Sequence, residues 1–308
     1  MNDDKIKDWI TVKGNHIPIK EGQSVEEAIS ERFDNEDEEI NLATDNLDEE
    51  IEVPKDELVT VSYYLEGFGK ITKAGYDKLK ERGKPVYIKT EITPDDNLLY
   101  ARLSKREDIK TAITKTNPLF DTGAYEWTYN CQRCVVALEM RLRGYDVTAK
   151  MRLPEDEETI FKYGSSWKDA WKGFQWRNFE QYVPGDGGAS ARLMEEEMIR
   201  EGEGARFIIS FQWTKPRWST KPARHVIMGI VENGKVNYYD PQSGKKTNSW
   251  KYKCNPREMD FARVDNLHLT DKVSNCVYDK GKQPTRKSVT TGKWMTKEES
   301  EEGYEEIQ

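Results

Sequence analysis

The stretch that most restricts the fold is 224–244, RHVIMGIVENGKVNYYDPQSG, in which two β-type runs flank Asn233 and Gly234. An Asn-Gly pair between such runs is the strongest local signal for a two-residue type I′ hairpin turn. This turn places Glu232 opposite Lys235, and every later pair of the hairpin follows from that register. The sequence therefore predicts an antiparallel hairpin with a defined register.

In this register His225 faces Gln242, and Asp240 is the diagonal neighbour of His225 on the same face. Diagonal neighbours lie about 7–8 Å apart at the backbone, which allows an Asp side chain to reach an imidazole. A lone strand histidine is usually structural, and an Asp before a proline is often only a turn former. The opposite face carries apolar residues that we expect in the core: Val226, Met228 and Ile230.

A second informative run, NCQRCVVALEMRLRGYDV, covers 130–147. Asn130 is a favoured N-cap and Gly144 suits the left-handed position after a helix, so we predict a helix over about 131–143. One apolar stripe follows at helical spacing: Cys131, Cys134, Val135, Leu138 and Leu142. The first cysteine then lies in the first turn, where free N–H groups and the helix dipole stabilise a thiolate.

The two cysteines of this helix allow several interpretations. A redox CxxC lacks the strand and proline expected around it, and a zinc site would need Cys254 and Cys276, which have no second CxxC spacing. The two cysteines could also be a buried, unreactive pair, in place of a nucleophile at a helix N-terminus. Together with His225 and Asp240, however, Cys131 completes a set of nucleophile, base and orienting group. We therefore predict these three as catalytic residues, with no metal and no cofactor.

The composition of the 308-residue chain restricts the kinds of partner that we expect it to bind. No apolar run is long enough to span a bilayer, and the N-terminus lacks a signal peptide, so we expect a cytoplasmic protein that binds no membrane. Segment 34–57 contains twelve Asp or Glu residues against Lys55 alone, which predicts a solvated acidic linker. The rest is close to neutral and has no Lys/Arg stripe interleaved with aromatic residues, so we expect no nucleic-acid partner.

Four stretches resemble the papain-fold cysteine hydrolases, in particular the papain-fold toxins described as glutamine deamidases: NCQRCVVALEMRLRGYDVTA, GARFIISFQW, RHVIMGIVENGKVNYYDPQSG and RVDNL. The resemblance extends over about 114–272. It implies an α+β fold in which a papain-like domain packs its N-terminal catalytic helix on an antiparallel sheet, with a small α+β region and an acidic linker before it. In the family the helix brings the nucleophile and the strands bring His and Asp, which matches Cys131, His225 and Asp240.

The resemblance also implies the activity. A papain-fold hydrolase of this kind acts on carboxamides, here as a glutamine deamidase or toxin-like effector with a protein substrate. A cysteine protease acting on a peptide bond and a non-catalytic binding protein of the same fold are the alternatives. Some papain-like proteases use the second cysteine of such a pair, so Cys134 is the alternative to Cys131 as nucleophile. No Gln precedes Cys131 closely as an oxyanion donor, which leaves its backbone N–H and an unknown second donor.

The N-terminal phrase DWITVKGNHIPI resembles a segment of tailed-phage minor head proteins. That resemblance implies a phage or prophage product, associated with the virion and docked on head or portal proteins through residues 1–33. We therefore expect five segments along the chain: a docking element at 1–33, the linker at 34–57, an α+β region at 58–113, the papain-like domain at 114–272 and a disordered tail at 273–308.

Overall fold

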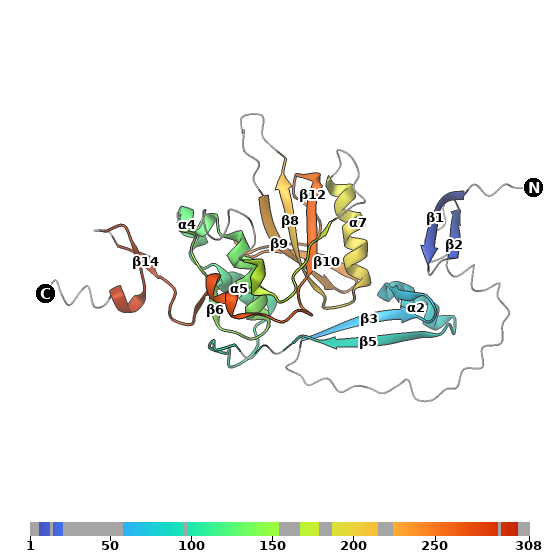
Figure 1. Cartoon of the computed structure of the whole chain (residues 1–308), viewed down its shortest axis with the longest axis horizontal. Coiled ribbons are helices and arrows are strands. Elements are labelled where there is room, and N and C mark those ends of the chain that lie inside the picture. The colour runs from blue at the N-terminus through green and yellow to red at the C-terminus, as the bar shows by residue number, and fades with distance from the viewer. Residues whose placement is uncertain are drawn as a thin grey trace, which may run out of the picture.

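The computed structural model describes residues 6–12, 15–20, 58–94, 96, 98–153, 167–178, 187–214, 224–288 and 291–300 (Figure 1). Every strand pair in these ranges is antiparallel, and helices cover the main sheet. The predicted α+β class is therefore confirmed.

The main sheet has six strands in the order β11-β10-β9-β8-β12-β7. Their bounds are Arg177–Asn178 for β7, Arg206–Trp213 for β8, Arg224–Glu232 for β9, Lys235–Asp240 for β10, Lys245–Thr247 for β11 and Cys254–Arg263 for β12. The chain returns from β11 to place β12 on the far side of β8. Residues well beyond the hairpin therefore build the interior of the sheet.

The β9–β10 hairpin has the predicted register. Lys235 pairs with Glu232, and the pairing continues to Tyr239 opposite Met228. Asn233 and Gly234 both have positive φ, 55° and 69°, as a type I′ turn requires. The ladder stops before the position where Gln242 would face His225.

Two helices enclose this sheet from its two faces (Figure 1). Helix α5, Cys131–Leu142, packs on the face that carries Val226, Met228 and Ile230. Helix α7, Gly187–Arg200, packs on the other face, where Ile227 and Val231 belong to a second core. The face of β9 that bears His225 is thus also a core face over most of its length, because α7 covers it.

Helix α5 ends as predicted, since Gly144 follows it with φ 90° and donates its N–H to Arg141. The helix is buried on almost every side, not along a single stripe. Even Glu139 and Arg141 are at most 2 % exposed, and both are paired with side chains of opposite charge. Because these buried positions hold charged residues, the hydrophobic pattern of the sequence does not show that the helix is buried on almost every side.

Residues 58–94 form a three-stranded sheet with one helix. The elements are β3 (Val59–Leu65), β4 (Gly69–Ile71), α2 (Lys73–Glu81) and β5 (Val86–Ile92), with the strand order β4-β3-β5. The hydroxyl of Thr72 accepts from Gly75 N and so caps α2. Tyr76 and Leu79 are the buried apolar residues of this helix.

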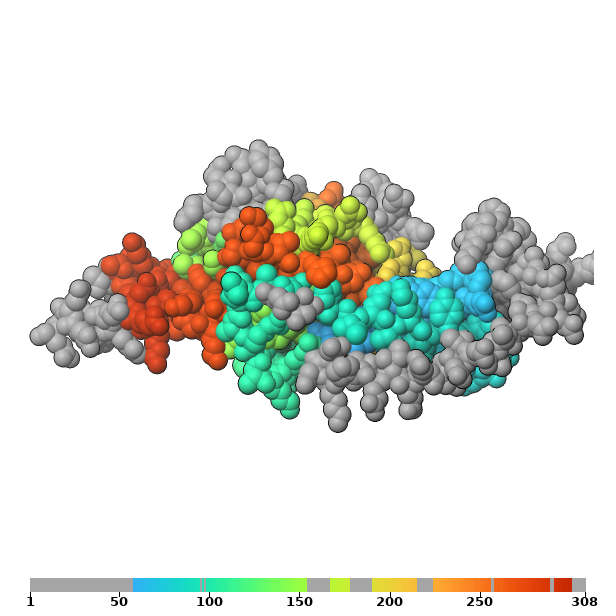
Figure 2. Space-filling view, turned by 60° about the horizontal axis from the view of Figure 1, so that its bottom comes forward, coloured from blue at the N-terminus to red at the C-terminus, as the bar shows by residue number. Residues whose placement is uncertain are grey.

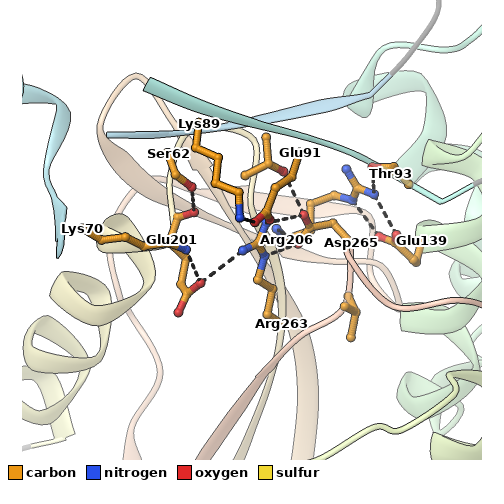
Figure 3. Close-up of polar contacts among 12 residues, drawn as sticks. Ser62, Lys70, Lys89, Glu91, Thr93, Glu139, Glu201, Arg206, Arg263 and Asp265 are labelled. Carbon is orange, nitrogen blue, oxygen red and sulfur yellow. Dashed lines mark hydrogen bonds and ion pairs between the residues drawn. The ribbon is translucent and has the colours of Figure 1, made fainter. Parts of the chain in front are cut away.

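A cluster of charged side chains joins this unit to the main sheet (Figure 3). Arg263 pairs with Asp265, Glu91 and Glu201 at 2.9–3.1 Å. Beside the cluster, the backbones of Val61 and Glu203 exchange two hydrogen bonds. In the space-filling view the blue to teal surface from residue 58 onward adjoins the orange surface of the C-terminal third (Figure 2). Region 58–113 is therefore firmly attached to the rest.

The expected disordered tail at 273–308 is wrong for its first part. Strand β13, Val277–Asp279, pairs with β6, Val147–Ala149, and Val273 and Cys276 are fully buried beside α5. Strands β14 (Arg286–Lys287) and β15 (Trp294–Met295) then form a small hairpin. A few buried apolar residues are enough to attach this stretch to the rest of the fold. Its mostly polar composition gives no sign of that attachment.

The remaining elements are short. They are β1 (Ile6–Val12), β2 (Asn15–Lys20), α3 (Ile109–Thr116), α4 (Tyr125–Thr128) and the 3₁₀ turns Phe120–Thr122, Lys168–Ala170 and Asp271–Asn275. Strands β1 and β2 pair with each other, whereas the linker at 34–57 lies outside the described residues. In the described part of the chain, no helix combines the length and apolar character needed to cross a membrane.

Candidate active site

Cys131 is the first residue of α5, and its side chain is half-buried. Asn130 holds the N-cap position, but its side chain makes no capping hydrogen bond. It donates instead to the carbonyl of Lys150 at 3.1 Å and accepts from the Cys134 thiol at 3.3 Å. Without a side-chain cap, the first N–H groups of the helix are left for another acceptor, which suits an oxyanion hole at this end.

His225 lies near the start of β9 and is 7 % exposed. Its Nε2 is 3.2 Å from Oδ2 of Asp240, and the side chain of Cys131 lies close enough to the ring to raise the pKa of His225. Because Asp240 occupies Nε2, the nitrogen that remains for the sulfur is Nδ1. The structure thus brings the three predicted residues together, with the histidine between the thiol and the carboxylate.

The electrostatics of the histidine follow from these contacts. Burial alone would lower the pKa of His225, but the hydrogen bonds and negative charges of Asp240 and Cys131 outweigh burial and raise the pKa from 6.5 to about 10. The ring is then an imidazolium at neutral pH.

Asp240 ends β10 and is buried, with 9 % of its surface exposed. Its Oδ1 accepts from Gln242 N at 3.1 Å, and its Oδ2 accepts from the Ser243 hydroxyl at 2.8 Å. Burial raises the pKa of Asp240, but His225 and these two donors reverse that effect and keep the pKa below its ordinary value. The carboxylate is therefore fixed in place and charged.

Cys134 has a different environment from Cys131. It is fully buried, it donates to Asn130, and burial raises the pKa of its thiol well above the ordinary value. A protonated thiol directed at an asparagine oxygen is a poor nucleophile. The geometry therefore favours Cys131 over the alternative.

An aromatic group covers the histidine, and the sequence did not reveal it. Trp213 stacks on the His225 ring at 5.8 Å between centroids and 23° between planes, while Phe211 meets the ring edge-on at 5.7 Å. Tyr252 lies 6.5 Å from the same ring. These rings reduce water access to the contact between His225 and Asp240 and so strengthen it. Phe211 lies opposite His225 in the pairing of β8 with β9, and no local sequence pattern indicates that pairing.

Gln242 donates its side-chain N–H to the carbonyl of Thr128 at 2.8 Å. Cys254 and Cys276 are buried, and all four cysteines are free. Among the residues that the structure describes, no group of three or more His, Cys, Asp or Glu side chains is arranged to hold a metal ion.

Comparison with known proteins adds one match. The model of a protein family described as papain fold toxin 1, glutamine deamidase matches residues 129–245, the segment that holds Cys131, His225 and Asp240. No curated protein and no solved structure matches the chain. The segment that carries the candidate site is thus similar to the papain-fold toxin family of glutamine deamidases, the family that the sequence motifs resemble.

Proposed function

We propose that the chain is a cysteine-dependent hydrolase that deamidates a glutamine of a protein substrate. The observation that carries the proposal is the position of His225, which pairs with Asp240 and lies beside Cys131, the first residue of a helix without a side-chain cap. The family match over 129–245 supports a carboxamide as the group attacked.

The reaction follows from the charges of these groups. The Cys131 thiolate attacks the carboxamide carbon, and the carbonyl π electrons move to the oxygen, which the N–H groups at the helix head stabilise. As the tetrahedral intermediate collapses, the imidazolium of His225 gives its proton to the departing nitrogen, and ammonia leaves. A thioester remains on the sulfur.

Water then completes the cycle. Neutral His225 removes a proton from water, the resulting hydroxide equivalent attacks the thioester carbon, and the C–S bond breaks to release glutamate and the thiolate. Asp240 contacts the ring only through Nε2, so it orients the imidazole and stabilises its positive charge. Peptide-bond cleavage would use the same three groups and differ in the leaving amine.

The experiment is mass spectrometry of host-cell proteins incubated with the purified chain. We expect one target glutamine to become glutamate with the backbone intact. Cys131→Ala or His225→Ala should lower the rate by roughly 10⁴-fold or more, and Asp240→Ala by less, since removal of the orienting group leaves the nucleophile and base in place. Cys134→Ala should keep most of the activity.

The other outcomes decide between the alternatives. Backbone cleavage that depends on Cys131 would keep the three residues and replace the deamidase with a protease. A complete lack of Cys131-dependent modification would favour a binding protein. The N-terminal resemblance to phage minor head proteins supports a phage or prophage origin, with the protein in the virion or in the host cytoplasm. Co-sedimentation with purified virions tests that part of the proposal.

A further inference from the structure

Asn117 lies in the described core near the candidate site, yet it touches none of the three proposed catalytic residues. It follows α3 as the C-cap and precedes Pro118, which disfavours helical backbone at the residue before it. Its φ and ψ are −137° and 67°, and it is 6 % exposed. The end of a packed helix thus places a buried carboxamide at a fixed point.

The carboxamide of Asn117 joins two segments that are far apart in the sequence. Its Nδ2 donates to the carbonyl of Trp127 at 2.9 Å and to the carbonyl of Gln242 at 2.8 Å. An amide nitrogen carries two hydrogens, so these bonds use both. A longer reciprocal contact of 3.4 Å links Asn117 to Asn130, the residue before Cys131.

Gln242 makes the second connection between the same segments. Its Nε2 donates to the carbonyl of Thr128 at 2.8 Å, and its backbone N–H donates to Asp240 at 3.1 Å. One residue therefore holds the carboxylate of Asp240 and is itself held by the loop that leads into Cys131. We call Asn117 and Gln242 together the clamp.

The turn after Asp240 has little other support in the fold, so the clamp is important for its position. The turn after Asp240 leads into β11, which has three residues and forms the edge of the main sheet. A short edge strand is stabilised from one side only and gives weak positional control. The clamp is the polar connection that fixes this edge to the head of α5, and a shift of 1 Å at a catalytic group can cost about 100-fold in rate.

We propose that Asn117 and Gln242 are positioning residues, which lock the Asp240 turn onto the head of helix α5 and so keep His225 in register with Cys131. The inference rests on the proposed function, because it assigns a role relative to the same three groups. The clamp itself touches neither substrate nor reacting atoms.

The test uses the full chain with Asn117→Ala and Gln242→Ala, and with Asn237→Ala as the matched control. Asn237 donates to Glu232 at the far end of the hairpin, away from the clamp. Two measurements are made on each folded variant: kcat and KM for deamidation, and the rate of Cys131 alkylation by iodoacetamide as a function of pH.

We expect Asn117→Ala to lower kcat by about 100-fold with little change in KM. Gln242→Ala keeps its backbone bonds and should lose about 10-fold. The double variant should lose less than the product of the two, because the residues act on one turn. In both single variants the alkaline limb of the alkylation profile should move to lower pH, since a displaced Asp240 no longer raises the pKa of His225 to the same extent. A merely structural role would not move that limb.

The alkylation profile needs no substrate, so it separates the two proposals. If Cys131→Ala leaves deamidation unchanged, the proposed function fails whatever the clamp does. If kcat and the alkylation profile of folded Asn117→Ala and Gln242→Ala both match those of Asn237→Ala, the clamp is refuted and the function is untouched. Should Asn117→Ala fail to fold, Gln242→Ala still provides both measurements, because Gln242 is partly exposed.

Discussion

Glu139 lies two turns along α5 from Cys131, and a single change there tests the buried charge cluster of Figure 3. The carboxylate is fully buried and accepts from Nε and Nη2 of Arg206 and from Nε of Arg143, each at 2.8 Å. Burial alone would raise the pKa of Glu139, but the two guanidinium groups lower it and keep the group charged. The substitution Glu139→Gln removes that charge and keeps the shape.

The expected loss in the free energy of unfolding depends on the partners that Arg143 and Arg206 keep after the substitution. Breaking a buried ion pair by removing one partner costs about 3–5 kcal/mol, because the other charge loses its compensation. Arg143 still pairs with Asp96 at 2.7 Å, and Asp265 still raises the pKa of Arg206 by its charge. These remaining partners place the expected loss at the lower end, about 3 kcal/mol, which corresponds to a fall in Tm of roughly 6–12 °C for a domain of this size.

Urea denaturation followed by circular dichroism measures the free energy of unfolding, with Asp77→Asn as the matched control. Asp77 pairs with Lys73 at 3.3 Å on the exposed face of α2, where water screens the pair, so the same change from carboxylate to amide should cost far less there. A loss below about 1 kcal/mol for Glu139→Gln, with an unchanged m value, would show that the cluster contributes no net stability and refute the reasoning.

Two further predictions concern pH and backbone geometry. The pKa of His225 is raised from 6.5 to about 10, so its proton stabilises the folded state fully below pH 6.5, and this contribution is lost as the pH rises towards 10. Urea titrations across this window should show the free energy of unfolding of the wild type falling more steeply than that of His225→Gln, and equal slopes would contradict the raised pKa. Gly202 has φ 109°, and a Cβ there would lie 2.3 Å from the carbonyl of Val61, so Gly202→Ala should cost about 3 kcal/mol. Gly234→Ala has positive φ but open space and should cost only about 1 kcal/mol; equal losses for the two would mean that the close approach of β3 is unimportant.

Local sequence rules were sufficient for the hairpin and for the C-terminal end of α5. The Asn233-Gly234 turn sets its own register, and the left-handed Gly144 ends the helix, so neither depends on distant parts of the chain. The register brings Asp240 close to His225, and the two side chains meet at 3.2 Å. For this reason the histidine and its carboxylate partner could be predicted before the fold was known.

The rest of the site depends on contacts between distant segments. Asn117 meets Gln242 across 125 positions of sequence, and Trp213 reaches His225 because β8 pairs with β9. Asn130 was expected to cap α5, but a fold that places Asn117 and Lys150 beside it offers other partners. Periodicity and turn propensity contain no information about such encounters.

Helix α5 connects the candidate site to the region at 58–113, which contributes none of the proposed catalytic residues. Cys131 and Glu139 are eight residues apart, about 12 Å along the helix axis, so the cluster around Glu139 fixes the helix from behind the site. That cluster depends on Arg206, which also bonds to Thr93 next to β5, and the adjoining Arg263 pairs with Glu91 of β5. The matched segment 129–245 lacks β12, which lies inside the main sheet between β8 and β7. A fragment cut to that segment would expose the edge of β8 and would remove Glu107 from Arg141 and Asp96 from Arg143. The unit that positions Cys131 is therefore larger than the matched segment.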